Sequence, residues 1–416
     1  MSEFQELHIG DHISLLSGFP FSSDRFNQNE GTRLIRIRDL LESDGDKTYY
    51  RGLFDSTWLV KPKDILIGMD GDFNIVRWQG DEALLNQRIL KVEAKPNGLI
   101  DQDYFFYWCG PYLSQVHSRT AATTVKHLST KDIAKAKALF PSNKQQQRIA
   151  EILQTVDLAI EETEALVKKW QKINAGFMQD LFARGVTPSG KLRPSRRDAP
   201  ESYRETPHGW IPKDWKVSCC ADEFTIDSGI TLGPHRRPNK SPYPYLRVAN
   251  VFRDRINLDE VTRLEATLEE ARQKALKTYD LLVVEGHANR NEIGRCAMVY
   301  NNAEGMLFQN HLFRLRAIRL DPCYSLLWLN SSHAQHYWES KCATSSGLNT
   351  INRKLLGAMP VLVPTSQEQT RIVEAIFSYR EMEGAHISSV AKLRAQKQGL
   401  MQTLLTGRVR VKIGHT

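Results

Sequence analysis

The sequence lacks several features that would set it apart from an ordinary soluble protein. Its 416 residues include 6 cysteines, and no two of them form a CxxC pair. This density is too low for a disulfide framework, so reduced thiols in a cytosol are the simplest interpretation. The N-terminus has no basic region followed by an apolar core, and the longest aromatic and apolar run, Tyr104 to Leu113, is too short to span a bilayer. We therefore expect a soluble cytoplasmic protein.

Motifs of common catalytic sites are also missing. The chain has no GxxxxGK[ST], GxGxxG, HExxH or GxSxG sequence. The segment starting at Asp321 resembles the (Asn/Asp)-Pro-Pro-(Tyr/Phe) loop of amino-methyltransferases but lacks its second proline, and we interpret Asp321 as a helix cap. Asp280 with Glu285 resembles a nuclease core without its lysine, and a structural role is favoured. His333 and His336 have no acidic or cysteine companions, so neither a metal site nor a catalytic site is predicted.

The composition is that of a globular protein with a basic balance. Hydrophobic residues make up 41% and charged residues 25% of the chain, and the formal net charge is +8. A pI near 9.1 favours an anionic partner, of which nucleic acid is the commonest. Charge alone does not decide the matter, because many basic proteins bind no polyanion.

A long amphipathic helix is predicted twice, over Pro141 to Arg184 and over Pro364 to Gly407. The two segments align without a gap at an offset of 223 (364 minus 141), with identical residues that include Arg148 and Arg371. The globular parts repeat as well, because Ser17-Gly18 corresponds to Ser228-Gly229 at an offset of 211 (228 minus 17). The protein is therefore a duplicated unit. The loops differ between the copies, which indicates either two different ligands or neutral drift.

Each copy is expected to be α+β. Strands are predicted over Arg33 to Leu40, where arginines alternate with apolar residues, and over the corresponding Pro244 to Val251. Asp101 is a plausible cap of an aromatic helix, and a short helix is expected around Lys131 to Leu139. The segment Gly185 to Pro207, rich in proline and arginine, is expected to be an irregular surface linker.

Apolar residues in both long helices recur at alternating steps of four and three, which is typical of a coiled coil. The centre of the second stripe is polar, which would weaken pairing with a copy of itself, so we expect the two helices to pair within one chain and antiparallel. The alternative is that each helix packs only on its own globular part. The predicted seam consists of Ile149, Leu153, Val156, Ile160, Val167, Trp170, Phe177, Leu181, Ile372, Ile376, Tyr379, Val390, Leu393, Leu400 and Leu404.

Loops at matching places in the two copies carry the residue types that read base edges and bind phosphates. Arg36, Arg38 and Arg247 have an equally good interpretation as ion-paired sheet residues, and any single loop is more often simply solvated. The candidate DNA-binding residues are Ser22, Arg25, Arg36, Arg38, Asp72, Asn74, Thr123, Thr124, Lys126, Arg236, Arg237, Arg247, Asn250, His287, Asn289, Arg290, Asn291, Ser345, Ser346 and Asn349.

The run from Gly209 to Trp215 (GWIPKDW), followed by Ser228-Gly229, resembles the opening of a target-recognition domain in the specificity subunits of type I restriction–modification enzymes. The starts of both long helices and the ending Leu404 to Val409 are also similar to that family. Two departures occur in the first half, which lacks the Ile-Pro-x-x-Trp opening and has Gln145 where glutamate is usual.

The resemblance implies a non-catalytic subunit that recognises a bipartite DNA target, with the helices setting the unread gap. Its implied partners are double-stranded DNA, two modification subunits that methylate adenine N6 with S-adenosylmethionine, and restriction subunits that use ATP and Mg²⁺. This chain itself would bind no cofactor. The alternatives are a coiled-coil adaptor without DNA specificity and a stand-alone DNA methyltransferase or nuclease. The implied organisation is recognition domain 1 (1–141), spacer helix (142–184), linker (185–207), recognition domain 2 (208–364), spacer helix (365–408) and tail (409–416).

Overall fold

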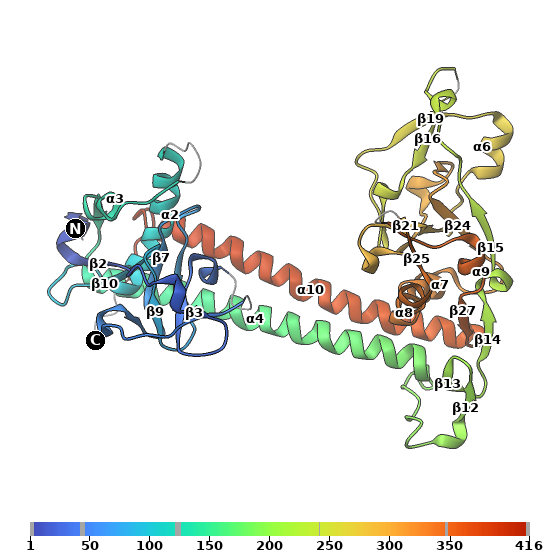
Figure 1. The fold of residues 1–416 in the computed structure, drawn as a ribbon, viewed down its shortest axis with the longest axis horizontal. Helices are drawn as coiled ribbons and strands as arrows, with labels where there is room; N and C mark the ends of the chain where they lie inside the picture. Colours follow the sequence, from blue (N-terminus) through green and yellow to red (C-terminus); the bar gives the residue numbers. More distant parts are fainter. Residues whose placement is uncertain (1–3, 42–45, 121–125, 241, 346–347, 413–416) are drawn as a thin grey trace. The chain divides into compact units, whose positions relative to one another are not determined.

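The computed structural model describes residues 4–41, 46–120, 126–240, 242–345 and 348–412 (Figure 1). They form two compact units, which we call unit 1 (Met1–Ala165 with Ile387–Thr416) and unit 2 (Leu166–His386). Two long helices, α4 (Asn143–Arg184) and α10 (Ser366–Leu404), each contribute to both units. In the described part of the chain, no helix is long and apolar enough to cross a membrane.

Unit 1 is built on two sheets. The first has the strand order β2 (Ile13–Ser17), β10 (Ile89–Ala94), β7 (Ile65–Gly68) and β8 (Ile75–Arg77). The second has the order β3 (Phe26–Asn27), β5 (Thr48–Tyr50), β4 (Thr32–Ile35), β9 (Ala83–Leu85) and β6 (Leu59–Val60). The strands β1 (Gln5–His8) and β11 (Lys137–Phe140) pair separately, and the helices are α1 (Ile9–His12), α2 (Gln102–Arg119) and α3 (Thr130–Ala134).

Unit 2 repeats the main sheet in the same order. Its strands are β15 (Phe224–Ser228), β24 (Leu312–Ala317), β20 (Leu281–Val284) and β22 (Cys296–Met298). A second sheet has the order β19 (Thr262–Glu265), β16 (Pro242–Leu246) and β23 (Leu307–Phe308). The remaining strands pair as β12 (Tyr203–Thr206) with β13 (Gly209–Pro212), β14 (Lys216–Cys219) with β27 (Pro360–Val363), β17 (Val251–Phe252) with β18 (Arg255–Ile256), and β21 (Gly286–His287) with β26 (Leu348–Thr350) and β25 (Ala343–Ser345). Its helices are α5 (Cys220–Glu223), α6 (Leu268–Lys274), α7 (Pro322–Leu329), α8 (Ser332–Lys341) and α9 (Arg353–Gly357).

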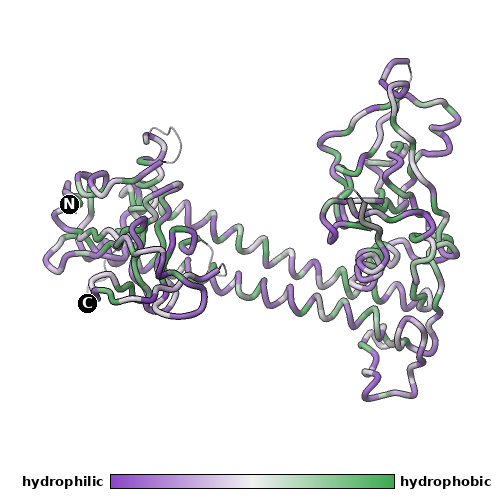
Figure 2. The backbone as a smooth tube through the Cα atoms, in the orientation of Figure 1, coloured by the Kyte–Doolittle hydropathy of each residue, from purple (hydrophilic) through white to green (hydrophobic). Residues whose placement is uncertain are grey.

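The duplication predicted from the sequence extends to strand register. In unit 1, β4 runs parallel to β9 with Ile35 opposite Leu85, and in unit 2, β16 runs parallel to β23 with Leu246 opposite Phe308. The central strands β7 and β20 are buried at every position. Figure 2 shows hydrophobic stretches of backbone within both units. Both units therefore have a mixed α+β core, as expected.

Antiparallel pairing of the two long helices is present within each unit. In unit 1, Lys397 of α10 lies 2.6 Å from the carboxylate of Asp157 on α4. In unit 2, Tyr379 of α10 contacts both Trp170 and Phe177 of α4, with ring centroids 5.5 and 4.6 Å apart. All predicted seam residues are buried or half-buried. Polar residues at the centre of the seam have partners across it, since Asn174 donates to Glu383 and His386 stacks on Trp170.

The helix ends also pack into the globular cores, so the two expected modes of packing coexist. Ile149, Leu153 and Leu404 belong to the core of unit 1. Leu181 and Ile372 belong to the core of unit 2. The hydrophobic stripe thus changes its role along each helix, from core packing near the globular part to helix pairing further along.

Two strand predictions were wrong in their second halves. The strand predicted over Arg33 to Leu40 ends at Ile35, and Ile37–Leu40 forms a 3₁₀ helix. In unit 2 the strand predicted over Pro244 to Val251 ends at Leu246, and Val248–Asn250 is again 3₁₀. A polar side chain explains both, because Asp39 and Asn250 accept hydrogen bonds from the backbone N–H groups of Arg36 and Arg247, each at 2.9 Å.

The other corrections concern connecting segments. The helix expected around Lys131 to Leu139 ends at Ala134, and the chain continues as β11, which pairs with β1. The predicted irregular linker contains β12, whose Tyr203 pairs with Pro212 and is buried. Asp101 and Asp321 cap α2 and α7 as predicted. Asp280 is structural, since its buried carboxylate receives two hydrogen bonds from Arg316, at 2.6 and 2.8 Å.

Candidate nucleic-acid interface

In unit 1 a polar turn, Asn86-Gln87-Arg88, joins β9 to β10 beside the Ser17-Gly18 segment. The N–H of Phe19 donates to the carbonyl of Leu85 at 2.9 Å, and the N–H of Gln87 donates back to the carbonyl of Phe19 at 3.1 Å. A Cβ atom at Gly18 would lie 2.0 Å from the carbonyl oxygen of Asn86. Glycine is required there because the two backbones come so close. We call residues 86–88 the amide turn of unit 1.

A surface hollow of about 360 Å³ opens beside this turn. It combines cations, amides and a hydroxyl with two aromatic rings, the mixture of donors and stacking surfaces that nucleic acids use. Among the described residues, the side chain of Arg36 has no hydrogen bond or ion pair within the protein and is exposed. The lining residues are Phe21, Ser23, Phe26, Arg36, Ile37, Arg38, Asn86, Gln87 and Arg88.

Asp70 fixes the last residue of the amide turn. Its carboxylate accepts from Arg88 at 2.5 Å and lies 2.6 Å from Nδ1 of His127. Partial burial raises the pKa of Asp70, but the hydrogen bonds from His127 and Arg88 outweigh it and hold that pKa below its ordinary value. Asp70 therefore stays ionised and holds Arg88 in place.

Unit 2 builds the same turn from Gln309-Asn310-His311, which we call the amide turn of unit 2. Ile230 donates to the carbonyl of Phe308 at 2.8 Å, and Asn310 donates to the carbonyl of Ile230 at 3.0 Å. A Cβ atom at Gly229 would lie 2.2 Å from the carbonyl oxygen of Phe308. The two turns therefore have matching backbone geometry.

The ion pair of the turn is repeated too. His311 lies 2.8 Å from the carboxylate of Glu285, as Arg88 lies beside Asp70. The backbone agrees, because Glu285 donates to the carbonyl of His311, and Met69 to that of Arg88, each at 3.0 Å. Each unit thus presents two amides and a carboxylate-held side chain that is cationic in unit 1 and ionisable in unit 2.

Two candidate loops meet in each unit. In unit 2, β21 pairs with β26, and the amide of Asn349 donates to the carbonyl of Ala288 at 3.2 Å. In unit 1, Gly71 donates to the carbonyl of Lys126 at 3.1 Å, and the ammonium of Lys126 donates to the carbonyl of His117 at 2.6 Å. The loops that the sequence predicted separately therefore form one surface per unit.

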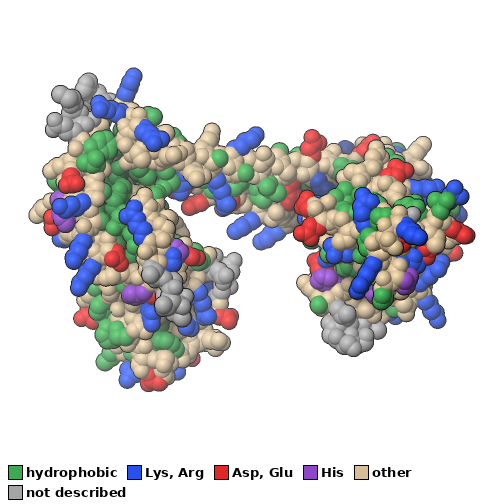
Figure 3. All heavy atoms as spheres, turned by 90° about the horizontal axis from the view of Figure 1, so that it is seen from above, with side chains coloured by type: hydrophobic (Ala, Val, Ile, Leu, Met, Phe, Trp, Pro, Cys, Tyr) green, Lys and Arg blue, Asp and Glu red, His purple; other side chains and the backbone are tan. Residues whose placement is uncertain are grey.

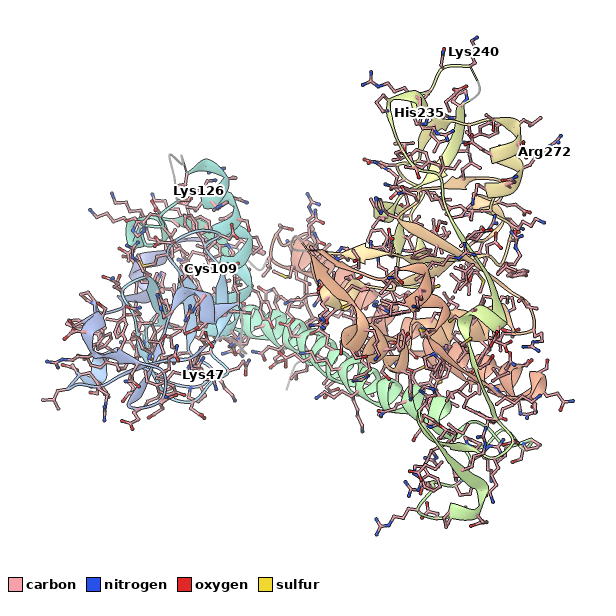
Figure 4. All side chains as sticks on the ribbon, turned by 45° about the vertical axis from the view of Figure 1, so that its right-hand side comes forward. Lys47, Cys109, Lys126, His235, Lys240 and Arg272 are labelled. Carbon is pink, nitrogen blue, oxygen red and sulfur yellow. The ribbon has the colours of Figure 1, made fainter. Side chains whose placement is uncertain are left out.

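Positive side chains are spread over both units. Figure 3 shows Lys and Arg side chains distributed over the visible face of each unit, between hydrophobic and other residues. In the side-chain view, His235 and Lys240 lie near one end of unit 2, and Lys126 lies at the surface of unit 1 (Figure 4). Among the described residues, no group of three or more His, Cys, Asp or Glu side chains could hold a metal ion.

Comparison with known proteins finds similarity to one family. A family model, the type I restriction modification DNA specificity domain, matches residues 1–169. The type I restriction enzyme EcoBI specificity subunit of Escherichia coli is 28% identical over 402 residues, which cover 94% of this chain and 82% of the relative. The MjaVIII specificity subunit of Methanocaldococcus jannaschii is 23% identical and covers 99% of this chain and 94% of the relative.

Solved structures show the same fold. The S subunit of a type I restriction–modification system from M. genitalium aligns with a TM-score of 0.53 at 14% identity, over 99% of this chain and 97% of the other. A chain from a type I restriction–modification system, studied for its complex assembly and conformational transition, aligns with a TM-score of 0.62 at 14% identity, over 97% of both chains. In sequence and in fold, this chain is similar to type I restriction–modification specificity subunits over nearly its whole length.

The Ile-Pro-x-x-Trp signature of this chain has a structural explanation. The indole of Trp215 is buried and donates to the carboxylate of Glu368 in the first turn of α10 at 3.0 Å. Arg193 of the linker donates to the same carboxylate at 2.9 Å, and so does the backbone of Val186. The signature therefore anchors α10 to the core of unit 2.

The predicted DNA-binding residues differ in their exposure to solvent. Arg25, Arg36, Arg38, Arg237 and Asp72 are exposed, and so are Ser22 and the loop residues Asn289, Arg290 and Asn291. Half-buried positions are Asn74, Lys126, Arg247 and His287. Thr123, Thr124 and Ser346 lie outside the described residues, and Ser345 is described only as part of β25.

Besides Arg38, Lys126 and Arg290, three further candidates form hydrogen bonds within the protein. Arg236 makes a two-pronged ion pair with Glu270, at 2.6 and 2.8 Å, and these hydrogen bonds lower the pKa of Glu270 to about 2. Asn250 is buried and donates to the carbonyls of Asn257 and Glu260. Asn349 is buried under the His287 loop. These three side chains form hydrogen bonds within unit 2, and their contact with DNA stays a prediction.

Sequence reasoning missed both amide turns. Short polar turns between strands are common, and neither copy stands out alone. The signal was present in the repeat, because Asn86-Gln87 and Gln309-Asn310 are related by the same offset as the helices, 223 (309 minus 86). Each copy has one Asn and one Gln, in reversed order.

Proposed function

We propose that each unit of this specificity subunit binds one segment of a double-stranded DNA target and that the two segments differ in sequence. The observation that carries the proposal is the amide turn, built on the same backbone in both units while the loops around it differ. Asn and Gln amides and Arg guanidinium groups are the side chains that form paired hydrogen bonds with base edges and phosphates. Two units with the same amide turn but different surrounding loops could bind the two different segments of a bipartite target.

We also propose that the chain acts through partner subunits. In this scheme two modification subunits with S-adenosylmethionine methylate adenine N6, and restriction subunits use ATP and Mg²⁺. The chain contributes recognition and binds no cofactor of its own. Support comes from its similarity to specificity subunits and from an interface whose chemistry suits an anion.

The long helices would set the length of the unread gap in the target. Both run without interruption from one unit into the other, α4 over 42 and α10 over 39 residues. Two readers on one face of B-DNA need sites about one helical turn, roughly 34 Å, apart. Seven residues inserted into α4 alone should therefore change the gap or abolish assembly, and an unchanged gap with full activity would contradict this role.

The test uses the chain assembled with its modification subunits. Binding to genomic duplex fragments should weaken steeply with salt, because phosphate contacts release counterions. Methylation should require both the chain and the modification subunits. The adaptor alternative predicts no salt-dependent DNA binding by the complex. The enzyme alternative predicts methylation or cleavage by the purified chain alone.

A further inference from the structure

The amide turns share a set of side chains that the surrounding loops do not share. Arg36 follows β4 and Arg247 follows β16, and the backbone N–H of each is capped by the side chain three residues later. Two amides and a carboxylate-held side chain complete the set in each unit. The neighbouring positions diverge, since Arg38 in unit 1 corresponds to Ala249 in unit 2 at the offset of 211 (249 minus 38).

The shared side chains are available for a ligand. In the described part of the chain, no hydrogen bond or ion pair within the protein occupies the guanidinium groups of Arg36 and Arg247 or the side-chain amide of Gln87. Gln87 is exposed, and Arg36 lines the 360 Å³ hollow. By contrast, Arg38 donates to the carbonyl of Asp46 at 3.1 Å.

We propose that Arg36 with the amide turn of unit 1, and Arg247 with that of unit 2, bind the sugar–phosphate backbone of DNA. This rests on the proposed function. If the two units read different base sequences, the side chains that are the same in both units should contact the part of DNA that is the same in both target segments. That part is the sugar–phosphate backbone. The loop positions that differ between the units are left to read bases. The shared set positions each unit on the duplex without contributing to sequence preference.

The backbone geometry supports this assignment. Gly18 and Gly229 bring a strand end against the carbonyls of each turn, so that the turn has little freedom to move. Asp70 holds Arg88 and Glu285 holds His311, which fixes the third side chain of each turn. A rigid, repeated donor set suits a ligand with a constant repeat, whereas base readers must differ between two sequences.

The experiment measures DNA binding by the complex of the chain with its modification subunits at several salt concentrations. In Arg36→Ala and Arg247→Ala, the slope of log affinity against log salt should become shallower by about 0.9 for each phosphate that the variant no longer neutralises. Between 50 and 200 mM salt, the affinity of each variant should then fall about 3-fold to 4-fold less than that of the wild type. Affinity for target and non-target duplexes should drop equally, and the methylated sequence should stay the same.

A second variant separates phosphate from base contact. Arg36→Lys keeps the charge but loses the two-pronged guanidinium, so it should keep the wild-type salt slope if the contact is to phosphate. Arg272→Ala is the matched control in unit 2, because Arg272 is exposed on α6 and its side chain extends outward (Figure 4). Its slope should be unchanged. Unchanged melting temperatures would show that all variants fold.

Two outcomes would overturn the inference. A change in the methylated sequence confined to one half of the target, or an unequal loss on target and non-target DNA, would make these residues base readers. Unchanged affinity and slope in Arg36→Ala and Arg247→Ala would remove them from the interface. Absence of DNA binding by the wild-type complex would instead contradict the proposed function itself.

Discussion

The two units hold the first turn of their long helix in different ways. In unit 2, Glu368 is buried and receives hydrogen bonds from Trp215, Arg193 and the backbone of Val186. In unit 1 the corresponding residue is Gln145, also buried, and its hydrogen bond comes from the hydroxyl of its neighbour Ser142 at 3.2 Å. One duplicated helix start thus has an ionic anchor in unit 2 and a neutral one in unit 1.

The aromatic partner changes together with the charge. Phe4 precedes β1 as Trp215 precedes β14, at the offset of 211 (215 minus 4). Both rings lie against a glycine just after a long helix, Gly407 in unit 1 and Gly185 in unit 2, each at φ +71°. Phenylalanine has no N–H to donate, so a buried carboxylate in unit 1 would lack the partner that Glu368 has. The two departures of unit 1 from the family pattern are therefore one linked change.

One contact is the same in both units. In unit 1, Gln146 accepts from the backbone N–H of Asp101 at 2.8 Å and donates to the carbonyl of Pro141. In unit 2, Gln369 accepts from the backbone N–H of Asp321 at 2.8 Å and donates to the carbonyl of Pro364. Each glutamine ties the start of a long helix to the cap of a domain helix. The glutamine contact is therefore a joint shared by both units, whereas the anchor at Gln145 and Glu368 differs between them.

The largest effect is expected when the ionic anchor is removed. Glu368→Ala leaves the indole of Trp215 and the guanidinium of Arg193 without their buried acceptor, and breaking a buried ion pair costs about 3–5 kcal/mol. Chemical denaturation of the chain should show this loss in the free energy of unfolding. The control Gln145→Ala should cost about 1 kcal/mol, since it removes a neutral hydrogen bond. Equal losses in the two variants would refute the asymmetry.

An intermediate effect of equal size is expected at the shared joint. Gln146→Ala and Gln369→Ala each leave a backbone N–H and a proline carbonyl unpaired in the interior, at a cost of about 1–3 kcal/mol. Denaturation curves of the two variants should shift alike. The exposed neighbour in Gln147→Ala provides the control and should change little. A loss in only one of the two would show that the joint is not equivalent.

The smallest effect concerns acid sensitivity of the amide turn in unit 1. Because the pKa of Asp70 is lowered in the folded protein, its stabilising contribution is present above its ordinary pKa and is lost as the pH falls through the folded value. Asp70→Asn should therefore lower the melting temperature slightly at pH 7, and the difference from the wild type should shrink in acid. A difference that grows on acidification would contradict the ion pairs of Asp70 with Arg88 and His127.

Much of the fold could be predicted because its signals are local or periodic. The heptad stripe predicted the seam, and Asp101 and Asp321 were recognisable as caps from their position before an apolar segment. The prediction that the strand continues beyond Ile35 was wrong because the side chain of Asp39 accepts a hydrogen bond from the backbone N–H of Arg36. The alternation of charged and apolar residues does not reveal this hydrogen bond.

The interface could be predicted less well, because long-range partners decide it. Arg236 looks like a free loop cation until Glu270, 34 residues away, is placed beside it. The amide turns depend on Gly18 and Gly229 approaching a strand end far away in sequence. Loop composition identified loops that meet in the structure, but not which of their side chains form hydrogen bonds within the protein.

The most direct test of a two-part reader is a genome-wide map of N6-methyladenine in cells that express this chain with its modification subunits. We predict one methylated motif with two specified segments separated by a fixed unspecified gap, absent when the chain is omitted. A continuous motif without a gap, or methylation that persists without the chain, would contradict the account.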